Sequence, residues 1–186
     1  MKNIAFYATS VKYISYALIP AVIIGFFIKW LAPEFSVSNP HIVGLFLSYT
    51  FDDYTTMTTA MPTMPFMQRL IGMCIDSIVA GLLIAILWLI ASLMKKFQDN
   101  EIFSASTVAL FTTLSKCAFY LALYTPINRM LLSVVTTFHN APGQRVLTAS
   151  FGSADLCNIL IFGILMVMTL LMQQATILQN EQNLTV

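Results

Sequence analysis

Stretches of predominantly apolar residues, each bounded by polar or charged positions, recur along the chain. They lie at residues 13–31, 72–93, 113–135 and 153–172. A helix rises about 1.5 Å per residue, so about 20 apolar residues cross a hydrocarbon core of about 30 Å. The pattern therefore predicts a single membrane domain: an all-α integral membrane protein with a four-transmembrane-helix bundle.

Two registers fit the third span, because residues 104–138 are apolar almost throughout. A helix over all of them would be about 52 Å long, far more than one bilayer needs. A span over 104–126 would put Lys116 near the bilayer midplane with no acid at its depth. A span over 113–135 instead lets Lys116 reach toward one interface and brings Arg129 to a depth similar to that of Asp76 in the second span. We therefore place residues 104–112 outside the bilayer.

Composition supports the membrane location. The chain is 58% hydrophobic and 9% charged, against about 45–50% apolar and about 25% charged residues in an average soluble domain. This excludes a soluble enzyme, a secreted disulfide scaffold and a disordered tail. The net charge of +1, without a cluster of Lys and Arg, argues against direct binding of nucleic acid. Cys74, Cys117 and Cys157 lie in apolar runs, where we expect them to be buried as small hydrophobes.

The positions of the cations orient the spans. Two Lys residues precede the first span and two follow the second, whereas residues 31–68 contain neither Lys nor Arg. Short cytoplasmic loops are enriched in Lys and Arg. We therefore expect a multi-pass protein of the bacterial inner (cytoplasmic) membrane with both termini in the cytoplasm. The loop 95–106 and the tail 173–186 then face the cytoplasm, and the loop 33–68 faces outward.

The ends of the first span carry residues typical of a membrane interface. Lys12 and Lys29 lie at its two ends, where their ammonium groups would reach the two interfaces. Trp30, next to Lys29, suits an aromatic belt. We therefore expect Lys29 and Trp30 to point toward the outer membrane surface.

The outer loops contain a candidate extracytoplasmic cap for the bundle. Residues 41–54, HIVGLFLSYTFDDY, are rich in β-branched and aromatic side chains, and residues 144–151, QRVLTASF, are similar in character. The two segments would pair as a short β element. The alternative is an interfacial helix at residues 41–51 that lies flat on the membrane.

Four polar residues inside the predicted spans form a candidate intramembrane network: Asp76, Arg129, Asp155 and Asn158. A charge at the bilayer centre costs roughly 2.5–3.5 kcal/mol on insertion scales and is usually paired. We expect Asp76 and Arg129 to pair, with Asp155 as the competing acid. Such a set marks either an ion or proton pathway or a contact that fixes helix packing, and we favour the packing role.

The outer loop also holds a methionine series, Met57, Met61, Met64 and Met67. Thioethers are soft ligands that select Cu(I), which makes the series a candidate metal site. Methionine also fills irregular gaps in apolar packing, and the chain has 11 of them. We therefore favour packing for these residues and expect no metal or other cofactor.

Signatures of catalysis are absent from the sequence. It contains no nucleophile elbow, HExxH motif, phosphate-binding loop or GxGxxG motif. His41 and His139 lie in different outer loops rather than at a metal-ligand spacing. We therefore expect the protein not to be an enzyme.

Two motifs in the C-terminal half carry a family resemblance. They are KKFQDNEIFSASTVALFTTLSK at residues 95–116 and LQNEQNLTV at residues 178–186. In the first, Ser104 suits the N-cap of a helix that enters the membrane, and Asp99 and Glu101 add negative charge near its N-terminus. From the loop after the second span to the C-terminus, the chain resembles the domain-of-unknown-function 2975 family of bacterial membrane proteins.

The resemblance implies a four-span inner-membrane protein without an established activity, cofactor or catalytic residue. It also implies a neighbourhood of small helix-turn-helix regulators, so the chain would be a membrane partner that controls a cytoplasmic transcription factor. The contact surface would then consist of residues 95–106 and 173–186.

We therefore expect a membrane regulator, a sensor or an accessory subunit of a larger membrane complex. The alternative is a small transport or Cu(I)-handling protein that uses the outer-loop methionines and the embedded Asp and Arg residues. Small residues such as Gly72 and Gly163 offer faces for close helix contact, either within one chain or in a homo-oligomer.

Overall fold

Within the residues that it describes, the computed structural model contains four long helices: α1 (Lys2–Leu31), α5 (Phe66–Gln98), α6 (Ala105–Thr137) and α7 (Ser153–Leu184). Each is long and apolar enough to cross a membrane, which confirms the predicted all-α membrane protein with four spans. The expected outer cap falls mainly on residues 32–63 and 140–150, and neither its β element nor its interfacial helix lies within the described residues. The structure describes residues 2–31, 64–99, 101, 104–139, 145, 147 and 151–184.

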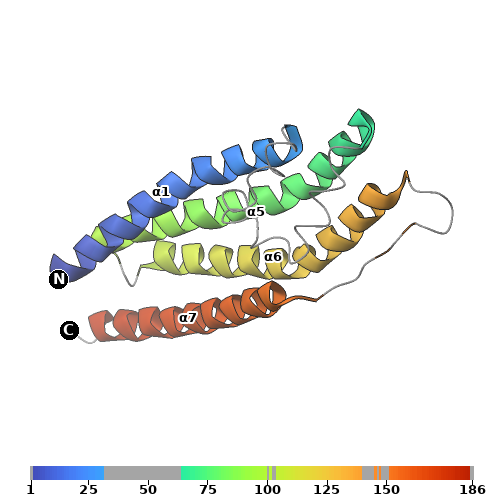
Figure 1. The fold of residues 1–186 in the computed structure, drawn as a ribbon. Helices are drawn as coiled ribbons and strands as arrows, with labels where there is room; N and C mark the ends of the chain where they lie inside the picture. Colours follow the sequence, from blue (N-terminus) through green and yellow to red (C-terminus); the bar gives the residue numbers. More distant parts are fainter. Residues whose placement is uncertain are drawn as a thin grey trace.

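Successive helices run antiparallel (Figure 1). Both termini lie at one end of the molecule, together with the α5–α6 connection, and we call this the terminal end. The opposite end, where α5 begins and α6 ends, is the distal end. Among the described helices, the substantial packing is that of α1 on α5, α5 on α6, and α6 on α7. The expected bundle is therefore open: it is a row in which α1 and α7 each have one main neighbour.

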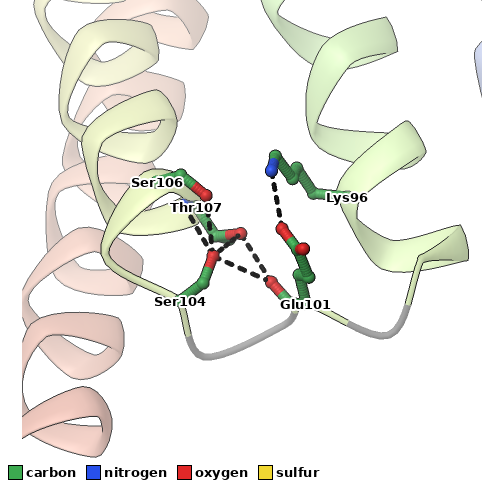
Figure 2. A network of polar contacts seen from close by, with 5 residues as sticks. All are labelled: Lys96, Glu101, Ser104, Ser106 and Thr107. Atoms are coloured by element: carbon green, nitrogen blue, oxygen red, sulfur yellow. Dashed lines mark hydrogen bonds and ion pairs between the residues drawn. The ribbon is translucent and has the colours of Figure 1, made fainter.

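Side-chain hydrogen bonds hold the turn that joins α5 to α6 at the terminal end (Figure 2). Ser104 Oγ accepts a hydrogen bond from the backbone N–H of Thr107 at 3.2 Å. The hydroxyls of Thr107 and Ser104 both donate to the Glu101 carbonyl oxygen, at 2.6 and 3.3 Å. The Glu101 carboxylate pairs with Lys96, from the last turn of α5, at 2.6 Å. The predicted N-cap at Ser104 is confirmed.

The two central helices project beyond their neighbours at the distal end (Figure 1). Both α5 and α6 contain 33 residues and are therefore about 50 Å long. By contrast, α1 ends at Leu31 and α7 begins at Ser153. Both central helices also extend past the spans expected from the sequence. A hydropathy pattern locates only the apolar part of a helix, whereas packing between the two helices stabilises their remaining turns.

The apolar core of the distal end consists of Trp30, Met64 and Leu132, which are at most 7% exposed. Trp30 belongs to α1 and Leu132 to α6, and Met64 lies just before α5. The prediction that Trp30 lies in an aromatic belt is therefore wrong. Because α5 continues past the end of α1, the indole packs against Gly72 of α5 instead.

The contact between Gly72 and Trp30 gives a testable prediction. A Cβ atom added at Gly72 would overlap the Trp30 ring, so Gly72→Ala is expected to displace the indole and lower the free energy of unfolding by about 1–3 kcal/mol. Thermal unfolding in detergent measures the change. The control is Gly81→Ala, where an added Cβ meets no atom within 4 Å. An equal loss of stability in both variants would contradict the assigned contact.

Candidate functional site

A buried ion pair joins the last turn of α1 to α5. Lys29 Nζ lies 2.6 Å from Asp76 Oδ2, and the two side chains are only 2% and 6% exposed. Burial removes the hydration of both charges, so their attraction and additional hydrogen bonds must offset that loss. The expectation that Lys29 extends to the membrane interface is wrong. Its side chain turns inward because Asp76 lies at the same level of the neighbouring helix.

Three donors surround the Asp76 carboxylate. Lys29 and Trp30 Nε1 both donate to Oδ2, at 2.6 and 3.0 Å, and Asn128 Nδ2 donates to Oδ1 at 3.3 Å. The Lys29 ammonium also lies 5.3 Å from the centroid of the Trp30 ring, within the range of a cation–π attraction. Asp76 therefore connects three helices: α1, α5 and α6.

A second buried ion pair joins α6 to α7. Arg129 Nη2 contacts Asp155 Oδ1, and the two side chains are 5% and 0% exposed. The other carboxylate oxygen of Asp155 accepts a hydrogen bond from the Gly152 N–H at 2.9 Å. Asp155 lies in the first turn of α7, where the helix dipole favours negative charge. Asn158, one turn further along α7, is also buried.

The predicted pairing of Asp76 with Arg129 is wrong, and the competing acid, Asp155, binds Arg129 instead. Asn128 and Arg129 are consecutive residues of α6, and consecutive residues point about 100° apart around a helix axis. Asn128 therefore reaches Asp76 on α5, whereas Arg129 reaches α7. Sequence position gives the depth of these residues, but the direction of each side chain relative to the neighbouring helices depends on packing.

Five residues from the two sets lie at one level of the helix row, where α1 ends and α7 begins. We call them the buried polar layer: Lys29, Asp76, Asn128, Arg129 and Asp155.

Sequence reasoning missed two members of the buried polar layer, Lys29 and Asn128. The sequence contains a signal for Lys29. If Lys12 and Lys95 lie at the same interface, Lys29 and Asp76 lie at similar depths, because the distance from Lys12 to Lys29 along α1 is similar to the distance from Lys95 back to Asp76 along α5. The latter distance is about 28 Å, close to the thickness of a hydrocarbon core, about 30 Å. Lys29 and Asp76 therefore lie at similar distances along their helices from lysines near the terminal end.

Other polar contacts hold the same helix pairs nearer the terminal end. Between α1 and α5, Lys12 Nζ donates to Gln98 Oε1 at 2.9 Å, and Gln98 Nε2 donates to Thr9 Oγ1 at 2.8 Å. Between α6 and α7, the hydroxyls of Ser115 and Thr169 lie 2.9 Å apart. Each outer helix is therefore attached to the row at two levels.

The methionine series is not described as one group. Met57 and Met61 lie outside the described residues. Met64 is 7% exposed and belongs to the distal core, whereas Met67 on α5 is 73% exposed. The burial of Met64 agrees with a packing role. Over the described parts of the chain, no three His, Cys, Asp or Glu residues are grouped so that they could hold a metal ion.

The cysteines differ from expectation. Cys74 and Cys157 are exposed on the helix surfaces, and Cys117 is half-buried. The expectation of burial rested on the apolar runs around them. In a membrane protein, however, an apolar run covers the outer surface of a helix as well as its packed face, because lipid rather than water meets that surface.

The family comparison covers nearly the whole chain. Residues 10–186 match the model of a family described as protein of unknown function (DUF2975). The match includes α5, most of α1 and every member of the buried polar layer, and so extends well beyond the C-terminal motifs that carry the resemblance in the sequence. No curated protein and no solved structure matches the chain. The chain therefore belongs to the DUF2975 family of proteins of unknown function.

Proposed function

We propose that this protein is a non-enzymatic regulator, sensor or accessory subunit of the inner membrane, and that it acts through a protein partner. The observation that carries the proposal is the engagement of its embedded charges with one another. Lys29 binds Asp76 across α1 and α5, and Arg129 binds Asp155 across α6 and α7. These contacts join neighbouring helices, which supports a structural role for the buried polar layer. We therefore look for the partner-binding surface at the ends of the molecule.

The terminal end has the features of a cytoplasmic surface. Both termini and the short α5–α6 turn meet there (Figure 1). Lys95 is exposed and Lys96 is about one-third exposed at the end of α5. Enrichment of cations in short loops favours the cytoplasmic side. This supports our proposal that the N-terminus, the turn and the C-terminal segment face the cytoplasm.

The C-terminal part of α7 is the best-supported contact surface for a partner. The helix continues to Leu184, beyond the apolar window that ends at Leu178. Ile177 and Leu178, at the very end of that window, are 57% and 59% exposed, and several Gln and Asn residues lie close to them in the sequence. Exposed apolar side chains beside a polar helical segment suit docking to a protein. We propose a cytoplasmic helix-turn-helix regulator as the partner, or alternatively a subunit of a membrane complex.

Affinity purification in mild detergent tests the proposal. The wild-type protein is expected to recover a protein partner, to be identified by mass spectrometry, and Ile177→Gln with Leu178→Gln is expected to reduce its recovery at least tenfold. Truncation of residues 173–186 should have the same effect. The matched control is Phe66→Gln with Met67→Gln, because that pair is similarly exposed, at 71% and 73%, but lies at the distal end.

Recovery of a partner can contradict the proposed surface in two ways, and a comparison of the variants in a third. One is recovery of the bare chain without a partner. The other is recovery of the same partner at wild-type level after the substitutions in α7. Equal loss in the α7 and distal-end variants would assign the effect to general destabilisation instead of docking, and would likewise contradict the proposed surface.

A further inference from the structure

We propose that the buried polar layer mechanically couples the distal end of α1 to the C-terminal segment of α7. Displacement of Lys29 and Trp30 would then change the position of α7 at the opposite end of the molecule. The coupling is a conformational property of the chain. Only its use in signalling to a partner rests on the proposed function.

The first step of the coupling is the contact between α1 and α6 through Asp76. Lys29 and Trp30, both from α1, bind one oxygen of the Asp76 carboxylate, while Asn128 of α6 binds the other. All four side chains are buried. A shift of the end of α1 therefore acts on Asn128 through a single rigid carboxylate group.

The second step is the passage of the displacement through α6. Asn128 is followed directly by Arg129, so the contacts with α5 and α7 come from one turn of helix. Pro126 lies just before this turn. Proline removes a backbone hydrogen bond and favours a bend, and α6 changes direction toward its distal part (Figure 1). The distal part of α6 can therefore pivot with Asn128 and Arg129 moving together.

The third step is the tilt of α7. Among the described residues, polar contacts attach this helix to α6 at two levels: Arg129 with Asp155 near its start and Ser115 with Thr169 further along. If the first contact moves, α7 rotates about the second. Along the helix, Asp155 is about 21 Å from Thr169 and Leu178 is about 13 Å beyond it. Leu178 would therefore move by roughly 0.6 of the displacement at Asp155, in the opposite direction.

The distal core lies directly beside the first contact of this path. The side chain of Met64, just before α5, packs with Trp30 in that core. A displacement of Met64 would therefore act on Trp30 directly. The layer is thus placed to pass an event at the distal end to the opposite end of α7.

Pulsed electron paramagnetic resonance on the full-length chain in lipid nanodiscs tests the coupling. Spin labels are attached through Lys95→Cys and Leu178→Cys, both at exposed positions, after Cys74, Cys117 and Cys157 are replaced by serine. Lys29→Met and Trp30→Phe are each expected to broaden the distance distribution or shift its mean by about 1–2 Å, the size of typical helix shifts. Trp30→Phe removes only the indole N–H donor and keeps an aromatic ring, so it also covers the case in which Lys29→Met does not fold.

Two further variants distinguish coupling from general loosening of α1. Tyr16→Leu removes an aromatic contact with Trp88 elsewhere on the same helix pair and should leave the distribution unchanged. Arg129→Gln should abolish the additional effect of Trp30→Phe, because the link to α7 is already cut. An unchanged distribution in Trp30→Phe, or an equal change in Tyr16→Leu, would overturn the proposal. Neither measurement requires a partner, so failure here is separate from failure of the proposed function.

Discussion

Asp76→Leu is expected to lower the free energy of unfolding by about 3–5 kcal/mol, because Lys29 would remain buried without its carboxylate partner. Trp30 and Asn128 would lose their acceptor at the same time. The loss should exceed that caused by any exposed substitution, since surface changes usually alter stability by no more than about 0.5 kcal/mol. Unfolding in mixed detergent micelles, followed by circular dichroism, measures it.

The matched control for this prediction replaces both charges. Lys29→Met with Asp76→Leu leaves no uncompensated charge, and buried ion pairs are often replaced by apolar side chains of similar volume without loss of stability. The double variant should therefore recover more than half of the stability lost in Asp76→Leu. A double variant as unstable as the single one would contradict the assignment of Lys29 as the partner of Asp76.

The second large effect is expected at the contact between α6 and α7. Arg129→Leu leaves the Asp155 carboxylate fully buried without its cation, and we expect a loss of about 3–5 kcal/mol. Since α7 packs mainly on α6 among the described helices, no other large interface would retain its distal end. A double-mutant cycle of Arg129→Leu and Asp155→Leu should give a coupling energy above about 1 kcal/mol.

The reference for that cycle is the pair Lys96 and Glu101, whose side chains are 33% and 50% exposed. Exposed ion pairs contribute about 0–1 kcal/mol, so the cycle of Lys96→Ala and Glu101→Ala should give a smaller coupling energy. If the effects of Arg129→Leu and Asp155→Leu were simply additive, the two side chains would not interact in the membrane-bound protein.

Much of the fold follows from local sequence patterns. The apolar stretches give the number and order of the helices, and the motif around Ser104 gives the start of α6 within one residue. Both depend on residues close together in the chain: a hydrophobic length for the span and a hydroxyl three positions before a backbone N–H for the cap. Neither requires knowledge of which helices are neighbours.

Only part of the membership of the candidate site is predictable from the sequence. Asp76, Arg129, Asp155 and Asn158 are all buried, as expected for polar residues within apolar spans. Their partners were not predictable from depth, because Asn128 and Arg129 have nearly equal depths and still bind different helices. The direction of the Lys29 side chain is likewise not given by its depth. A lysine at the end of a span can extend outward or turn inward, and a nearby acid on another helix decides which.

The sequence by itself determined that this is a multi-pass α-helical membrane protein, which stretches of it form the spans, and that Asp76, Arg129 and Asp155 need partners. Only the tertiary structure decided that the helices form an open row, that Trp30 packs on Gly72, and that the charges divide into two pairs joined through α6. The physical reason is the range of the interactions. Hydropathy and capping act along the chain, whereas ion pairs in a membrane form between helices whose rotation and order are set by packing.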